Sequence, residues 1–285
     1  MKKTAFSLIE LSVILLVIGV LAAIISKGGS LIYSARISSA QSTTSSSKVS
    51  QIDGLVVWYE TVMDDSLSSD SRLDNKAVTY WQDISSQLNI AEEKNRLIGP
   101  DDNDPSIVKI AYRKEGINDL PSLQFTSSGN FVLTSLAGGV SNLGTVFAVL
   151  SPTLPLSGSM TFLDSANSND NALSLRSSSF LFESGGSYSI ANSFQSGEVY
   201  VVGLNMSDDV KLFVNNVDSV GSNTGSVING FDGLMVGTDR GGADNFTGLI
   251  SEIIIFDRIL NVEERRRIMS YLAKKYSVRV EGAAS

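Results

Sequence analysis

The feature that most constrains this chain is an apolar run near its N-terminus. Residues Phe6 to Ile25 carry one charge, at Glu10, and Lys2 and Lys3 precede them. As a helix, those 20 residues extend about 30 Å, which matches the hydrocarbon core of a bilayer. The two lysines favour a cytoplasmic N-terminus. The run therefore predicts a hydrophobic helix long enough to cross a membrane.

Two general interpretations leave Glu10 unexplained. A secretory signal peptide would be cut at a small-residue site, for which Ala22 and Ala23 are available. A plain membrane anchor would keep the run intact. In either case a carboxylate at the edge of the apolar segment costs a few kcal/mol on insertion.

A third interpretation accounts for Glu10. The runs Ala5 to Leu11 (AFSLIEL) and Ile18 to Ile24 (IGVLAAI) resemble the class III signal of type IV pilins and pseudopilins. The resemblance implies that a prepilin peptidase cuts between Ala5 and Phe6 and methylates the Phe6 amine. It also implies that Glu10 pairs with the terminal amine of a neighbouring subunit, because an unpaired buried charge is strongly unfavourable. Ala5 departs from the family, in which Gly usually precedes the cut.

Beyond this run, the residue composition of the chain changes twice. Ser and Thr dominate from Ser38 to Ser50 and weaken a helix by competing for backbone hydrogen bonds, so helix and linker both stay open. Beyond Gly54, short apolar runs alternate with turn residues, as in an all-β sandwich. The predicted parts are a leader 1–5, a transmembrane and assembly helix 6–37, a spacer or helix continuation 38–53, a head 54–278 and a tail 279–285.

The head is predicted to contain ten strands and one closing helix. Asn215-Asn216 suits a tight hairpin, because Asn tolerates positive φ. Asn261 and Glu264 have the spacing of a capping box ahead of the helix. The strands are expected at 55–59, 78–82, 122–125, 145–150, 160–164, 172–175, 199–204, 211–214, 234–237 and 249–256.

Five segments of the head are similar to concanavalin A-like, laminin G type jelly rolls. They are Gly54 to Trp58, Tyr80 to Asp83, Leu120 to Phe125, Phe246 to Arg258 and Tyr271 to Tyr276. The fold class expected from both resemblances is a long N-terminal hydrophobic α-helix followed by an all-β jelly-roll sandwich with a C-terminal helix. Relatives of such sandwiches bind ligands, act as spacers or catalyse reactions, so the fold does not choose among these roles.

Composition excludes several kinds of chemistry. The formal charge of -8 and the lack of a basic cluster argue against a nucleic-acid partner. Without His or Cys, the chain has no His-based catalytic pair and no thiolate metal site. Glu252 and Asp257 are separated by an odd number of positions, so a regular strand would point them to opposite sides. The chain is therefore not expected to be an enzyme.

Calcium is the only cofactor for which the sequence offers candidates, because Asp and Asn are frequent in its loops. The alternative is that these are solvated acidic loops. Trp58 and Trp81 are expected in the core rather than as sugar-stacking platforms, because apolar residues flank them. The calcium candidates are Asp101, Asp104, Asp164, Asp239 and Asp244, with Asp170 as a further neighbour of Asp164.

These observations support two functional hypotheses. The first is a structural subunit of a type IV pilus-like filament, as major pilin, minor pilin or pseudopilin, with an adhesive head as an option. Its partners would be copies of itself or other pilins, the prepilin peptidase and the inner membrane, and its final location an extracellular filament or a periplasmic pseudopilus. The alternative is a membrane-anchored carbohydrate- or surface-binding module that does not polymerise. Both allow a glycan or surface ligand.

Overall fold

The structure is a computed structural model of the chain. It describes residues 8–85, 95–100, 110–126, 129–136, 144–156, 158–167, 171–191, 194–195, 197–207, 210–215, 217–218 and 230–279. Within these ranges, the side chains of residues 8, 20–27 and 217–218 are not described.

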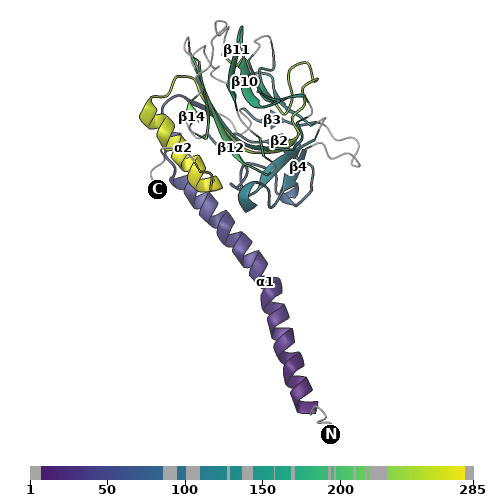
Figure 1. Cartoon of the computed structure of the whole chain (residues 1–285). Helices are drawn as coiled ribbons and strands as arrows, with labels where there is room; N and C mark the ends of the chain where they lie inside the picture. The colour runs from purple at the N-terminus through teal and green to yellow at the C-terminus, as the bar shows by residue number, and fades with distance from the viewer. Residues whose placement is uncertain are drawn as a thin grey trace.

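Two antiparallel sheets pack face to face and form the head (Figure 1). The first sheet has the spatial order β14 (Val217–Asp218), β13 (Lys211–Val214), β12 (Tyr200–Met206), β7 (Gly144–Pro152), β16 (Gly248–Phe256), β5 (Ser122–Phe125), β4 (Ile110–Arg113). One edge of β16 pairs with β7, and its other edge pairs first with β5 and then with β1 (Leu55–Glu60). A register shift between Ile250 and Glu252 separates these last two pairings.

The second sheet closes the sandwich. Its order is β11 (Ser187–Ala191), β10 (Ser179–Glu183), β9 (Ala172–Arg176), β8 (Ser159–Asp164), β15 (Leu234–Val236), β6 (Phe131–Leu133), β3 (Leu97–Ile98), β2 (Tyr80–Trp81). Side chains that alternate along the strands of both sheets fill the space between them, among them Trp81, Phe125, Phe162 and Ile253. The β-sandwich predicted from the apolar pattern is confirmed.

The C-terminal helix α2 (Val262–Tyr276) covers part of the outer face of the first sheet. Asn261 caps it: the Asn261 side chain accepts a hydrogen bond from the Glu264 N–H, and the Glu264 side chain accepts one from the Asn261 N–H. This capping box is the predicted one. Ile268 and Leu272 pack on the sheet in a second apolar cluster with Trp58. The core positions predicted for Trp58 and Trp81 are likewise confirmed.

A long helix, α1 (Leu8–Ser46), leads into the head (Figure 1). Its C-terminal part is docked: Ala40 is buried in the same cluster as α2, and Thr44 shares a hydrogen bond of 3.2 Å with the Tyr271 hydroxyl. The Gln41 side chain donates to the carbonyl of Val62 at 2.9 Å. A short 3₁₀ helix, η1 (Val49–Gln51), then connects α1 to β1.

The predicted long hydrophobic helix requires a correction. Over the residues that the structure describes, no helix is both long and apolar enough to cross a membrane. From Ser34 to Ser46, α1 is mostly polar and docks on the head. The predictions of a transmembrane helix over residues 6–37 and of that fold class are therefore wrong in this respect.

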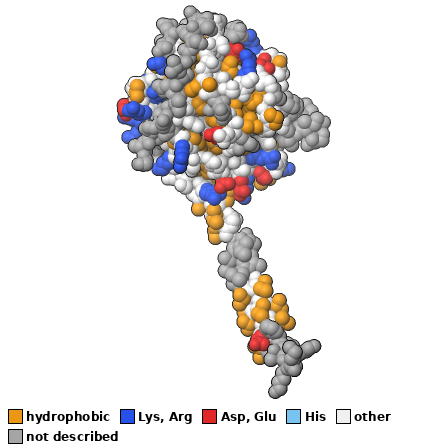
Figure 2. Space-filling view, in the orientation of Figure 1, with side chains coloured by type: hydrophobic (Ala, Val, Ile, Leu, Met, Phe, Trp, Pro, Cys, Tyr) orange, Lys and Arg blue, Asp and Glu red, His pale blue; other side chains and the backbone are white. Residues whose placement is uncertain are grey.

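The exposed apolar side chains of α1 are visible in Figure 2, below the head. Ile9 and Leu16 are 73% and 68% exposed, and Glu10 follows Ile9 in the first turn of the helix. Charged side chains of both signs gather instead where α1 meets the head.

Several elements were not predicted from the sequence. They are β3, β4, β6, β10, β11, β14 and the 3₁₀ helices η2 (Asp70–Arg72) and η3 (Ile117–Asp119). The predicted turn at Asn215 is confirmed: Asn215 has a φ of 49°, and Val214 pairs with Val217 across it.

Candidate functional site

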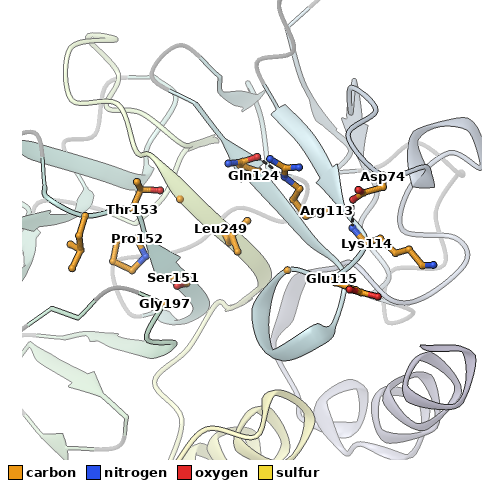
Figure 3. A pocket seen from close by; sticks show the side chains of 13 residues that line it. Asp74, Arg113, Lys114, Glu115, Gln124, Ser151, Pro152, Thr153, Gly197 and Leu249 are labelled. Atoms are coloured by element: carbon orange, nitrogen blue, oxygen red, sulfur yellow. Dashed lines mark hydrogen bonds between the residues drawn. The ribbon is translucent and has the colours of Figure 1, made fainter. Parts of the chain in front are cut away.

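The outer face of the first sheet is open beyond the end of α2, and a pocket of about 630 Å³ lies there (Figure 3). Its floor is a row of three side chains in register, Gln124 on β5, Leu249 on β16 and Ser151 on β7. Their neighbours Leu123, Ile250 and Leu150 face the core instead, because successive strand residues alternate in direction. The floor is therefore fixed by three paired strands.

One wall of the pocket is the chain that leaves β4. The Arg113 Nε donates to the Gln124 Oε1 at 2.6 Å, and the Arg113 Nη1 donates to the Asn75 side chain. The Asp74 carboxylate accepts a hydrogen bond of 2.9 Å from the Lys114 N–H. These contacts order Arg113 and Lys114 at the wall, as the dashed lines in Figure 3 show for the residues drawn.

The opposite wall is the end of β7 with Pro152, Thr153 and Gly197. Gly197 has a φ of 76°, and a Cβ placed on it would meet no atom within 4 Å. Gly248, on the floor side, has a φ of 149°, and a Cβ there would overlap the Ser151 carbonyl oxygen. Glycine at position 248 allows the backbones of β16 and β7 to approach, and glycine at position 197 adopts its positive φ while leaving that wall free of a side chain.

Several polar groups at the pocket have hydrogen-bonding capacity left over. Within the described part of the chain, the Gln124 amide nitrogen and the hydroxyls of Ser151 and Thr153 have no protein partner, and neither does the Glu115 carboxylate. The four charged residues that line the pocket, Asp74, Glu115, Arg113 and Lys114, sum to zero. The pocket therefore offers donors and acceptors to a polar ligand without a dominant charge.

The structure describes three of the predicted calcium candidates, Asp164, Asp239 and Asp244. The carboxylates of Asp164 and Asp239 lie near enough to interact electrostatically. Asp164 lies at the end of β8, where its Oδ2 accepts a hydrogen bond of 2.8 Å from the Arg240 N–H. Burial raises the pKa of Asp164, and the nearby Asp239 carboxylate adds to this. Burial also acts to raise the pKa of Asp239, but hydrogen bonds from the N–H groups of the turn that follows it outweigh burial and lower that pKa.

In this arrangement the carboxylates accept hydrogen bonds from backbone N–H groups of the turn. The Asp239 Oδ1 accepts from the Ala243 and Asp244 N–H groups at 2.7 and 2.6 Å. Among the residues described, no three acidic side chains gather in a way that could hold a metal ion. Asp101, Asp104 and Asp170 lie outside the described residues. A calcium site stays a prediction.

The predicted processing residues, Ala5 and Phe6, also lie outside the described residues. Glu10, predicted for assembly, is exposed on α1. None of the pocket residues was predicted as a site. Arg113 and Lys114 belong to strand β4 and its exit, which the sequence pattern did not reveal. Gln124 and Ser151 did stand in or beside predicted strands, and the signal for them was a polar residue at an outward position within an apolar run.

Comparison with known proteins gives similarities of fold only. No family model matches the chain, and no curated protein matches it. The structure is similar to the binding domain of Paraclostridial Mosquitocidal Protein 1, at 13% identity and a TM-score of 0.52, covering 78% of this chain and 52% of that one. It is also similar to a Trypanosoma rangeli sialidase in complex with sialic acid, at 14% identity and a TM-score of 0.51, covering 78% and 33%.

A further similarity is to domain 4 of AbnA, a GH43 extracellular arabinanase from Geobacillus stearothermophilus, in complex with arabinotriose. It has 17% identity, a TM-score of 0.48 and coverage of 74% and 95%. The chain spans about half of the mosquitocidal binding domain and a third of the sialidase. The class of protein that these findings define is a β-sandwich domain.

The resemblance to type IV pilins and pseudopilins is corrected by these findings. No family model supports it, the similar structures named here are β-sandwich domains, and the described residues contain no membrane-spanning helix. The laminin G type assignment is reduced to its fold, the β-sandwich, because no family model matches the head either.

Proposed function

We propose that the head is a carbohydrate- or surface-binding module and that the pocket between β4 and the end of β7 is its ligand site. The observation that carries the proposal is a set of hydrogen-bonding groups without a partner in the described part of the chain: the Gln124 amide nitrogen and the Ser151 hydroxyl on the floor, and the Thr153 hydroxyl on the wall. Sugars present closely spaced hydroxyls that both donate and accept, so amide and hydroxyl side chains are suitable partners. The volume, about 630 Å³, is within the range of small-ligand sites.

Two similar structures support the proposal. One is a domain described as a binding domain, in the mosquitocidal protein, and the other is a sialidase with sialic acid bound, which supports a sugar as ligand. Their identity to this chain is too low to transfer a particular sugar. An extracytoplasmic location, expected from the sequence, is part of the proposal.

Binding without catalysis is also part of the proposal. Asp74 and Glu115 both line the pocket, but the Asp74 carboxylate already accepts from the Lys114 N–H and from the Asn75 side chain. Most glycosidases use one free carboxyl to protonate the leaving group and a second as nucleophile or base. Product analysis after incubation with each glycan tests this point, and released sugar would contradict it.

The test is a binding screen on the full chain with sialyllactose, arabinotriose, cellohexaose, xylohexaose, chitohexaose and laminarihexaose. We expect Gln124→Ala to weaken binding of the best ligand by roughly 5- to 10-fold, the effect of losing one or two hydrogen bonds. The matched control is Gln82→Ala, because the Gln82 Oε1 accepts from the Arg96 Nε at 2.8 Å next to β2 and β3 of the other sheet, and neither residue lines the pocket. No binding by any glycan, or equal losses from both variants, would overturn the proposal.

A further inference from the structure

The segment that forms one wall of the pocket also contacts α1. Lys114, Glu115 and Gly116 line the pocket on one side. The next turn, η3, lines a second hollow of about 460 Å³ together with α1 and the end of α2. One short segment, residues 114–120, therefore stands between the proposed ligand and the helix.

This segment has a backbone that needs outside support. Asn118 and Asp119 have φ values of 49° and 61°, two successive residues in the left-handed region that is unfavourable for side chains with a Cβ. The Asn118 side chain donates to the carbonyl of Tyr276 at the end of α2. The Asp119 carboxylate binds Arg36 of α1 at 2.6 Å. Both helices thus hold the turn in this conformation.

A second contact joins α1 to the rim of the pocket. The Lys114 ammonium lies 4.0 Å from the centre of the Tyr33 ring, a cation–π contact. Tyr33 also shares a hydrogen bond with Tyr112, the β4 residue next to Arg113. Burial raises the pKa of both tyrosines, so both hydroxyls stay protonated and keep this hydrogen bond at neutral pH. In Figure 3 both helices pass below the wall that carries Lys114 and Glu115.

We propose that α1 is a positioning element of the pocket: seating of residues 33–44 against the head holds the segment 114–120 in its ligand-competent conformation. This inference rests on the proposed function for the identity of the ligand. It adds that ligand binding at the pocket and the docking of α1 on the head are thermodynamically coupled. A force or partner that lifts α1 lowers affinity at the pocket, and a bound ligand strengthens the seating of α1 by the same factor.

The test compares two substitutions on one helix. Ala40 is 5% exposed in the contact with the head, whereas Ala35 is exposed on the same helix. Ala40→Glu places a carboxylate in the apolar contact and unseats α1, and Ala35→Glu adds the same charge without contact. Hydrogen exchange of residues 110–120, glycan affinity and thermal unfolding are measured on each full-length variant.

We expect Ala40→Glu to raise exchange in residues 114–120 and to weaken binding of the best glycan in the panel by about 5-fold or more, the lower end of typical allosteric coupling. Ala35→Glu should match the unmodified protein in both. Tyr33→Leu should weaken binding about threefold through Lys114, and Tyr33→Phe, which keeps the ring face and loses only the hydrogen bond to Tyr112, should weaken it less. If Ala40→Glu raises exchange in α1 while segment 114–120 and affinity stay unchanged, the inference is overturned.

Two further outcomes are informative. If the unmodified protein binds no glycan, the proposed function fails, and the exchange of residues 114–120 alone decides whether α1 orders the wall. If Ala40→Glu unfolds the head, the milder pair Arg36→Gln and Asp119→Asn replaces it. Each should raise exchange of the turn, and the double variant should add nothing to either single one, because both remove one ion pair.

Discussion

Glu60 and Glu252 lie directly opposite each other on β1 and β16, fully buried, and the Lys275 ammonium bridges their carboxylates at 3.0 and 2.8 Å. Two like charges in cross-strand register repel unless a cation lies between them. The hydroxyls of Tyr271 and Tyr276 also donate to Glu252, at 2.7 and 2.9 Å. This cluster therefore joins β1 and β16, the first and last strands of the sheet along the chain, to α2.

Lys275→Met tests this cluster. The substitution leaves two buried carboxylates without their cation, so we expect a loss of about 3–5 kcal/mol in the free energy of unfolding, measured with urea. Lys274→Met, at the exposed neighbouring position, is the control and should change stability little. Adding Glu60→Gln and Glu252→Gln to Lys275→Met should recover much of the loss. Equal stability of the two lysine variants would show that the ammonium is not needed.

The pH dependence of the free energy of unfolding should reflect the titration of the Asp83 carboxyl. Burial raises the pKa of Asp83 to about 6, against hydrogen bonds from the Trp58 and Ser85 N–H groups that lower it. The folded state therefore binds this proton more tightly than the unfolded state, and the contribution of Asp83 to stability increases as pH falls from about 7 to about 4. Asp83→Asn should raise stability at pH 8 by about 1–3 kcal/mol.

The same substitution should flatten the stability profile between pH 4 and 7. Asp65→Asn, at an exposed site nearby, is the control. Urea unfolding at pH 4, 5, 6, 7 and 8 measures both variants. A profile for Asp83→Asn that runs parallel to the unmodified protein would contradict the assignment.

Gly237→Ala should be strongly destabilising. Gly237 has a φ of 95°, and a Cβ there would overlap the ring of Phe125 in the core. We expect a loss of about 2–4 kcal/mol, from backbone strain together with overpacking. Gly158→Ala isolates the backbone part, because Gly158 has a φ of 82° and open space around it, and should cost about 1 kcal/mol. Similar losses at both positions would argue against the overlap.

Gly197→Asn should obstruct the pocket without unfolding the head. Asn tolerates the positive φ of this position, and its side chain would enter open space at the pocket wall. We expect glycan affinity to fall at least about 10-fold while the melting temperature changes by only a few degrees. Gly158→Asn, at a comparable φ, should leave affinity unchanged. Retained affinity in Gly197→Asn would place the ligand elsewhere.

The periodic parts of the fold were predictable from the sequence. Alternating apolar residues and turn residues located most long strands, and the Asn261–Glu264 spacing located the start of α2. The short strands β3 and β14 have two residues each, too few for a pattern. β4 (Ile110–Arg113) is bounded by residues without a clear turn signal on one side, and only its pairing with β5 reveals it.

The candidate site was less predictable, because its residues become neighbours only through strand register. Gln124, Leu249 and Ser151 are far apart in the chain and align only because β16 pairs with both β5 and β7. At the N-terminus the reasoning from sequence failed differently. There a short local pattern was read as a membrane and assembly signal, whereas the structure joins the apolar and polar parts into one helix that docks on the head.

The position of β16 between strands from the first half of the head has a consequence for how the chain folds during synthesis. Its pairing with β1 joins Leu55 to Phe256, about 200 residues later, so the ribosome needs roughly 10–40 s to supply the central strand. Until β16 is available, β1, β5 and β7 each have an unpaired strand edge. Unpaired edges favour aggregation. A chain released before Gly248 lacks that strand altogether, so we expect the first sheet to complete its pairing only after β16 has been synthesised.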